Sequence, residues 1–286
     1  MKKNILILII ILIISVFIYG VFVGTYKIFP YDELNSVKSI TLNEKTIPDQ
    51  QNTIYENNVS ELIQIKDNDD ISKLKNNLID FIWKNNGFPN SKLPASVNQD
   101  ISNSLYDDFL NLKRIDQFNI EMEYGVNSIS YLFTPESSNN KLIIYHQGHG
   151  GDFYKGKDTI QYFLEQNYSV LAFSMPLLGM NEQPVVDLPN IGKFKLDKHA
   201  HFRFLDTNDF SPIKFFMEPI AVSLNYLDEN YNFSSYHMVG LSGGGWTITV
   251  YSAIDDRISQ TYSIAGSVPI YLRTIPLNFG DYEQWH

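Results

Sequence analysis

From Phe118 onward, short apolar runs typical of buried strands alternate with segments of helical spacing. The strand candidates are KLIIYHQ, YSVLAFSMP, YHMVGLS and RISQTYSI, and the helix candidates are DTIQYFLEQN, PIKFFMEPIAVSLNYLDEN and GGWTITVYSAID. Apolar strands separated by helices predict an α/β fold with a doubly wound, mostly parallel sheet, because helices must then cover both faces. FNIEMEYG and NSISYLFTP alternate in polarity and predict an antiparallel hairpin before that sheet. Pro219 falls inside one helix candidate, which predicts a kink or an early break.

The N-terminus carries a topology signal. Lys2 and Lys3 precede a run from Ile5 to Val23 without a charge. At about 1.5 Å per residue, this run nearly spans a hydrocarbon core of about 30 Å. The flanking lysines favour a cytoplasmic N-terminus. We therefore expect an N-terminal transmembrane helix that acts as a single-pass membrane anchor, with the bulk of the chain extracytoplasmic. A cleaved signal peptide is the alternative.

Three regions follow from these patterns. We expect the anchor at residues 1–25, a stalk with a helical extension at 26–117, and the α/β domain at 118–286. The formal charge of −10 argues against nucleic acid as a partner, because phosphate binding needs a basic face. The chain has no cysteine, which excludes disulfides, thiolate metal sites and a cysteine nucleophile.

The stretch GLSGGGW, from Gly240 to Trp246, lies between a predicted strand and a predicted helix. Ser242 therefore falls at the carboxyl end of a strand, where ligands bind in sheets of this kind. Gly240 and Gly244 flank it as G-x-S-x-G, a spacing that lets a sharp turn project the serine hydroxyl without side-chain clashes. The stretch lacks the lysine that a phosphate-binding P-loop needs. We predict that Ser242 is a nucleophile.

A second glycine-rich stretch, HQGHGG at residues 146–151, follows the strand candidate KLIIY. Acyl-transfer enzymes stabilise their oxyanion with two backbone amides, one from the residue after the nucleophile and one from such an upstream loop. Here the two donors would be Gly243 and either His149 or Gly150. We expect the His146 and His149 imidazoles to fix the loop rather than to abstract protons.

With these two motifs in their strand–turn–helix setting, the region from Phe118 to the C-terminus resembles the α/β-hydrolase superfamily. It is most similar to the serine esterase, lipase and peptidase branches. The resemblance implies a serine nucleophile, a histidine base, an acid that orients the histidine, no cofactor and a small-molecule or acyl-bearing substrate.

The chain departs from this pattern after Ser242. The superfamily places the acid and then the histidine after the nucleophile, but residues 243–286 leave room for only one helix and one strand. We therefore expect a C-terminally truncated, incomplete sheet. Asp281 and Glu283 are candidates for the acid, but both are expected to be surface carboxylates. His286, a candidate base, is expected to be a terminal residue without a catalytic role.

The stretch HAHFRFLDTND permits a metal interpretation through His199, His201, Asp206 and Asp209. A lone H-x-H pair is weak evidence, and we expect no metal site and a substrate-contacting cap here instead. The aromatic residues nearby either pack in the core or line an acyl pocket, and core packing is the default: Phe202, Phe204, Phe210, Phe215 and Phe216.

The sequence thus predicts a membrane-anchored serine hydrolase that acts on an ester or an amide. The alternatives are a non-catalytic binding module with the same fold, and an inactive truncated fragment that lacks the acid and the histidine.

Overall fold

The computed structural model describes residues 2–26, 59–63, 65–189, 191–267 and 280–284. The chain divides into two units, Met1–Asn58 and Val59–His286. Residues 27–58, which hold most of the expected stalk, and His286 lie outside the described residues. The second unit begins at Val59, whereas the α/β domain is expected to begin at residue 118, so part of the expected helical extension belongs to the same unit as the sheet.

In the first unit, α1 (Lys2–Tyr26) is one helix that includes the whole uncharged run. Among the described residues, no helix meets the length and hydropathy of a membrane span.

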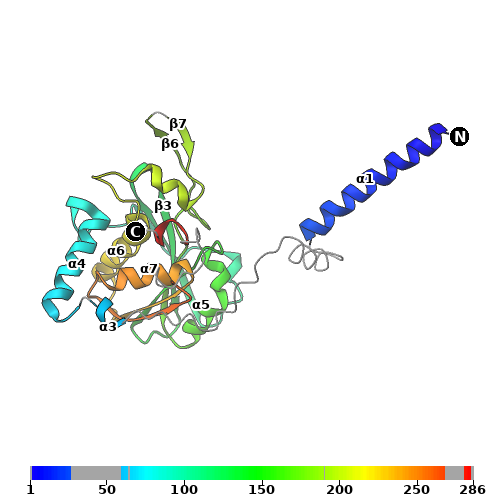
Figure 1. The fold of residues 1–286 in the computed structure, drawn as a ribbon. Helices are drawn as coiled ribbons and strands as arrows, with labels where there is room; N and C mark the ends of the chain where they lie inside the picture. The colour runs from blue at the N-terminus through cyan, green and yellow to red at the C-terminus, as the bar shows by residue number, and fades with distance from the viewer. Residues whose placement is uncertain (1, 27–58, 64, 190, 268–279, 285–286) are drawn as a thin grey trace. The chain divides into compact units, whose positions relative to one another are not determined.

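The second unit contains a seven-stranded sheet covered by helices and a separate two-stranded hairpin that projects from it (Figure 1). Its strands are β1 (Ser96–Asn98), β2 (Leu112–Glu121), β3 (Asn127–Pro135), β4 (Lys141–His146), β5 (Ser169–Phe173), β6 (Val185–Leu188), β7 (Gly192–Lys195), β8 (Ser235–Leu241) and β9 (Ile258–Ile264). Its helices are α3 (Val59–Leu62), α4 (Asn68–Trp83), α5 (Lys157–Glu165), α6 (Lys214–Asn230) and α7 (Gly243–Ser252).

The large sheet has the strand order β1-β2-β3-β5-β4-β8-β9. The pairs β5–β4, β4–β8 and β8–β9 are parallel, as the apolar strand runs predict. The predicted hairpin is also present, because β2 and β3 pair antiparallel. The sheet begins upstream of the expected boundary at residue 118, since β1 pairs with β2 from Ser96 onward and β2 itself starts at Leu112.

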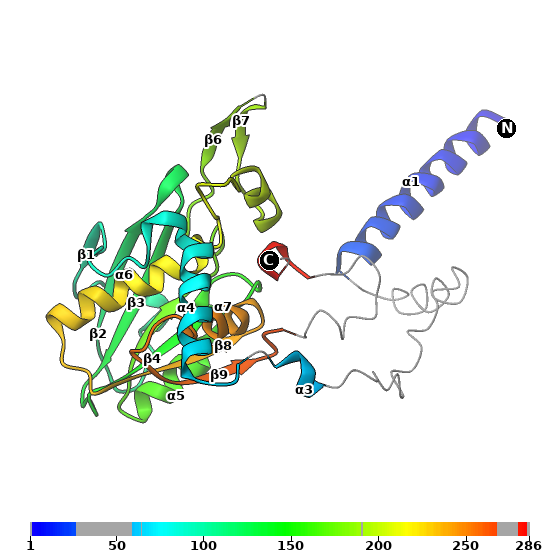
Figure 2. The same ribbon diagram turned by 60° about the vertical axis from the view of Figure 1, so that its left-hand side comes forward.

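Alternate residues of the central strands enter two separate cores. On β4, Leu142 and Ile144 pack into the core beneath α4, α6 and α7, whereas Ile143 and Tyr145 pack into the core beneath α5. Figure 2 shows α4, α6 and α7 together on one side of the sheet. Burial on both faces explains why this strand is a continuous apolar run, since successive side chains point to opposite faces.

Of the kink or early break predicted at Pro219, the break does not occur. Helix α6 runs from Lys214 to Asn230 with Pro219 inside it, and most of its residues are buried. Proline removes one helical hydrogen bond, but helical stability in proteins comes mainly from tertiary packing. Burial of most of the helix outweighs the local preference.

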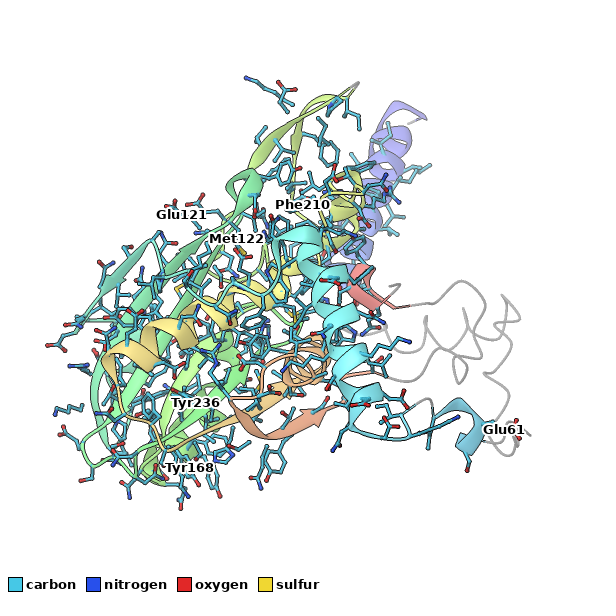
Figure 3. All side chains as sticks on the ribbon, turned by 90° about the vertical axis from the view of Figure 1, so that its left-hand side faces the viewer. Glu61, Glu121, Met122, Tyr168, Phe210 and Tyr236 are labelled. Carbon is cyan, nitrogen blue, oxygen red and sulfur yellow. The ribbon has the colours of Figure 1, made fainter. Side chains whose placement is uncertain are left out.

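Figure 3 shows the two opposite ends of the strands in the large sheet. Tyr168 and Tyr236 lie where β5 and β8 begin, and Glu121 and Met122 lie at the opposite end, where β2 ends. This second side, where the parallel strands have their carboxyl ends, is called the carboxyl edge of the sheet. The segment between β5 and α6 adds the small hairpin β6–β7 and the short 3-10 helix η5 (His199–Phe204).

Candidate active site

Ser242 occupies a strained turn between β8 and α7 at the carboxyl edge. Its backbone has φ 55° and ψ −124°, a conformation that non-glycine residues rarely adopt. Such conformations cost of the order of 1–3 kcal/mol and persist only where the surroundings enforce them. The turn is anchored by a hydrogen bond of 2.8 Å from the Ser242 amide to the Ile264 carbonyl at the end of β9.

The glycines of the turn make close backbone approaches. A Cβ added at Gly240 would lie 2.5 Å from the Gly244 carbonyl oxygen, and one added at Gly244 would lie 2.2 Å from the His146 carbonyl oxygen. No side chain fits at such distances. The spacing G-x-S-x-G is therefore explained by packing of β8 and α7 against each other and against the loop after β4.

The Ser242 hydroxyl makes no hydrogen bond to another residue that the structure describes. Serine at a helix N-cap usually accepts a hydrogen bond from the first turn, but this side chain makes no capping bond. Ser242 is exposed, and its Oγ has no hydrogen-bond partner among the described residues. The strained turn thus presents the hydroxyl outward instead of using it as a cap.

The loop after β4 lies directly against this turn. A Cβ at Gly148 would be 2.8 Å from the Ser242 Cβ, and the His149 ring is so close to Gly243 that a Cβ there would lie 2.4 Å from its Cε1. The backbone amides of His149 and Gly150 donate no hydrogen bond to another described residue. Gly243 opens α7, where the first amides of a helix have no intrahelical acceptor.

The two histidines of the loop have different surroundings. His146 is buried, and its Nδ1 lies 2.9 Å from the Gln147 carbonyl oxygen. Burial lowers the pKa of His146 to about 4, so its imidazole is neutral at pH 7. His149 is partly exposed and reaches three other titratable side chains.

His149, His199 and Glu283 form a compact cluster beside the turn. His149 Nε2 lies 3.2 Å from His199 Nδ1 and 3.0 Å from Glu283 Oε1. Glu283 Oε2 lies 3.4 Å from His199 Nδ1, and Asp281 Oδ2 lies 3.4 Å from His149 Nε2. The cluster joins the loop after β4, η5 and the short 3-10 helix η7 (Tyr282–Gln284).

The expectation that Glu283 is a surface carboxylate is wrong. Its side chain is 0% exposed, because η7 folds back against η5. Burial alone would raise the pKa of Glu283, but the two neighbouring imidazoles hold it at about 2. Burial likewise acts to lower the pKa of His149, and Glu283 and Asp281 outweigh burial and raise it. Asp281, in contrast, is exposed as expected.

The H-x-H pair does not act as a unit. It lies in η5 rather than in a strand, and His201 Nδ1 faces Asp197 Oδ1 at 3.3 Å, away from the cluster that contains His199. Neither Asp206 nor Asp209 joins that cluster. His199, His201, Asp206 and Asp209 therefore do not form one site, and His199 instead lies beside His149 and Glu283. Positions 149, 199 and 283 are far apart in the sequence, and no local pattern connects them.

The aromatic residues near η5 pack mainly in the core. Phe202, Phe215 and Phe216 are at most 1% exposed, whereas Phe204 is 38% exposed. The default interpretation of core packing holds for the first three.

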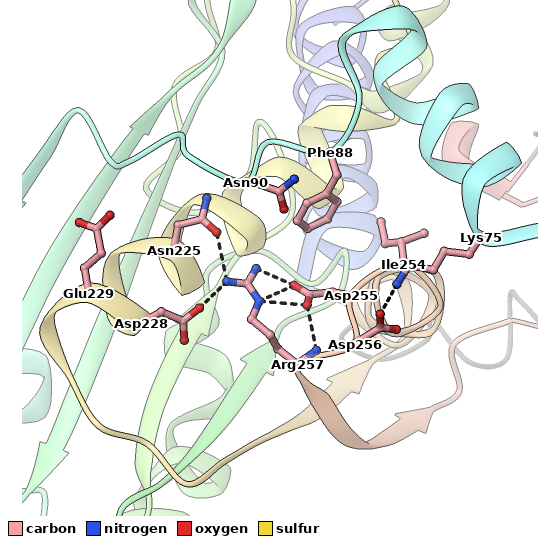
Figure 4. A pocket seen from close by; sticks show the side chains of 10 residues that line it. All are labelled: Lys75, Phe88, Asn90, Asn225, Asp228, Glu229, Ile254, Asp255, Asp256 and Arg257. Carbon is pink, nitrogen blue, oxygen red and sulfur yellow. Dashed lines mark hydrogen bonds and ion pairs between the residues drawn. The ribbon is translucent and has the colours of Figure 1, made fainter. Parts of the chain in front are cut away.

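A cleft of about 490 Å³ lies at the other edge of the sheet (Figure 4). Its central residue is Arg257, which precedes β9 and binds Asp255, Asp228 and Asn225. Because Arg257 is at the amino end of its strand and Ser242 follows the carboxyl end of the neighbouring strand, this cleft is separate from the serine turn.

No family model matches the sequence, and no curated protein sequence is similar to it. Solved structures with a similar fold include an esterase from Pyrococcus furiosus, at 17% identity and a TM-score of 0.42 over 60% of this chain and 58% of that one. Acetyl xylan esterase 1 from Thermoanaerobacterium sp. gives 15% identity and a TM-score of 0.46 over 68% and 57%. A putative acetyl xylan esterase from Bacteroides fragilis has 17% sequence identity and a TM-score of 0.48, over 68% of this chain and 53% of that one.

The chain thus spans a little more than half the length of these proteins, and the likeness concerns the fold. The parallel sheet with helices on both faces, and the strained strand-to-helix turn at its carboxyl edge, agree with the resemblance noted in the sequence. The described part of the second unit thus has an α/β fold with a mostly parallel central sheet.

Proposed function

We propose that this protein is a serine hydrolase that acts on an ester or an amide through Ser242. The observation that carries the proposal is the turn itself. A strained backbone presents an exposed hydroxyl that makes no hydrogen bond to another described residue, directly at the N-terminus of α7. Strain of this kind is costly and concentrates at functional sites.

In the proposed reaction, Ser242 Oγ attacks the substrate carbonyl carbon and its proton passes to a base. The tetrahedral intermediate collapses to an acyl-enzyme as the alcohol or amine leaves with a proton. Water then attacks the acyl carbon and releases the acid and the free serine. No cofactor takes part in these steps.

The oxyanion of the intermediate would be bound by backbone amides. Gly243 is the residue after the nucleophile, and His149 or Gly150 would supply the second amide from the adjacent loop. Two observations support this assignment. Gly148 lies in close contact with Ser242, and the backbone amides of His149 and Gly150 donate no hydrogen bond to another described residue. The dipole of α7 favours negative charge at the same place.

A non-catalytic binding module is the second candidate. The observation in its favour is that no imidazole is hydrogen-bonded to Ser242 Oγ among the described residues. Such a module would keep the turn and bind acyl-bearing molecules without turnover.

A fluorophosphonate probe separates the two candidates, because it labels activated serines. We expect labelling of the full chain at Ser242, identified by peptide mass spectrometry, and hydrolysis of p-nitrophenyl acetate. Ser242→Ala should abolish both. Ser252→Ala, at the other end of the same helix, is the matched control and should change neither. An unlabelled wild-type protein that remains folded would favour the binding module.

We further propose that the uncharged run in α1 anchors the protein in a membrane with the second unit extracytoplasmic. The proposal is supported by the run from Ile5 to Val23 and by Lys2 and Lys3 before it. Carbonate extraction of membranes, combined with protease protection of spheroplasts, tests it. Release into the soluble fraction, or protection of the second unit from external protease, contradicts it.

A further inference from the structure

We propose that His149, His199 and Glu283 form a binding site for a divalent transition metal of the Zn²⁺ type. Two imidazoles and a carboxylate are a ligand set found in zinc enzymes. The three donor groups come from three separate segments, and their ligand atoms all lie within 4.8 Å of one another. The proposal concerns these side chains only and does not depend on the chemistry of Ser242.

The spacing of the donor atoms fits a common metal ion. Ligands about 2.0–2.1 Å from a tetrahedral Zn²⁺ lie about 3.3 Å from each other. Here the two imidazole nitrogens lie 3.2 Å apart, and each is near a different Glu283 oxygen: His149 Nε2 lies 3.0 Å from Oε1 and His199 Nδ1 lies 3.4 Å from Oε2. A small inward adjustment of side chains would complete the coordination.

The ring nitrogens of the cluster face one another and the carboxylate. His199 Nε2 lies 2.8 Å from the Pro176 carbonyl oxygen, which can only accept, so Nε2 carries a proton and donates it. The other nitrogen of this ring, Nδ1, lies 3.2 Å from His149 Nε2 and 3.4 Å from Glu283 Oε2. A cation between these three groups would accept a lone pair from each of them, with the proton of the His149 ring on Nδ1.

Glu283 provides independent support. It is 0% exposed, and neither of its carboxylate oxygens makes a hydrogen bond with acceptable geometry to any described residue. Its contacts with the imidazoles are close in distance but poorly aligned for N–H donation. A buried carboxylate without such bonds is costly, and coordination of a metal is one of the established ways to offset that cost.

The surroundings also resemble a ligand shell. Metal-binding histidines generally donate their second ring N–H to a carbonyl or carboxylate, which fixes the ring, and the His199–Pro176 hydrogen bond does this. Asp281 stands next to His149 as a further carboxylate. A divalent ion with Glu283 and Asp281 beside it would be charge-neutral.

The test measures metal binding directly, in the full-length Ser242→Ala protein, so that its result is independent of hydrolysis. After chelator treatment, the protein is titrated with Zn²⁺ by calorimetry and with Co²⁺ by visible spectroscopy. We expect one ion per chain, the intense d–d bands of four-coordinate Co²⁺, and a higher melting temperature with Zn²⁺.

Variants identify the ligands. Glu283→Gln and His149→Ala should each weaken Zn²⁺ binding by at least about tenfold, since even outer-shell changes cost about 10–100-fold. His201→Ala, the other member of the H-x-H pair, is the matched control and should leave the affinity unchanged. His149 is partly exposed, so its variant is expected to fold even if the buried Glu283 variant does not; circular dichroism checks both.

The proposal is overturned if the wild-type protein binds no stoichiometric ion. It is also overturned if His149→Ala binds as tightly as the wild type, or if His201→Ala loses binding while His149→Ala keeps it.

Discussion

Replacing Gly244 by alanine tests whether close packing holds the turn that carries Ser242. The new Cβ would lie 2.2 Å from the His146 carbonyl oxygen and 2.7 Å from the Gln147 carbonyl oxygen. Both are backbone atoms and cannot rotate away. Since carbon–oxygen contacts need about 3.3 Å, α7 and the loop after β4 must separate by about 1 Å.

This separation should affect both stability and reactivity. Extra methylenes in a packed site typically destabilise by about 1–3 kcal/mol, so we expect the free energy of unfolding, measured by urea denaturation, to fall by that amount. A displacement of about 1 Å at a reacting group can reduce rates about 100-fold. The rate of fluorophosphonate labelling at Ser242 should therefore fall by about two orders of magnitude.

Gly150→Ala is the control for stability, because its Cβ would meet only side-chain atoms at 3.8 Å or more. Its unfolding free energy should stay within about 0.5 kcal/mol of the wild type. If Gly244→Ala unfolds and labels like the wild type, the packing argument for the serine turn is refuted.

Two further predictions concern buried charges away from the serine. Glu218→Ala should lower the unfolding free energy by about 3–5 kcal/mol, because the buried Glu218 accepts hydrogen bonds from Trp83 Nε1 at 2.9 Å and Lys92 Nζ at 2.6 Å and faces Lys214. Asp108→Ala removes a surface pair with Lys157 and should leave denaturation unchanged; equal effects of the two variants would contradict this reasoning. Burial acts to raise the pKa of Asp255, but hydrogen bonds from Arg257 and Tyr251 outweigh it and lower the pKa below its ordinary value. A lowered folded-state pKa means that this stabilisation is present above the unfolded value of about 3.9 and is lost as pH falls through the folded value. Asp255→Asn should therefore lower the free energy of unfolding at pH 7 and make that free energy fall less between about pH 5 and about pH 3. Urea titrations at several pH values measure this, and the same fall in the variant as in the wild type would contradict the prediction.

Much of the fold could be predicted from the sequence because the responsible signals are local. The continuous apolar runs of β4, β5 and β8 predicted parallel strands covered on both faces, and the structure confirms them. The position of Ser242 at a strand-to-helix turn also followed from its immediate neighbours, since Gly240 is needed for a close backbone contact with Gly244, whereas the reason for Gly244, its contact with the His146 carbonyl, appears only in the tertiary structure.

Other features depend on contacts between distant segments, and only the tertiary structure decided them. Helix α6 continues through Pro219 because its burial, which the sequence does not specify, outweighs a local preference. The polar C-terminal stretch predicts that Glu283 is a surface residue, yet η7 places it in a buried position between His149 and His199. A charge near the end of a sequence is normally solvated, and nothing in its neighbours indicates that two imidazoles from other segments will surround it.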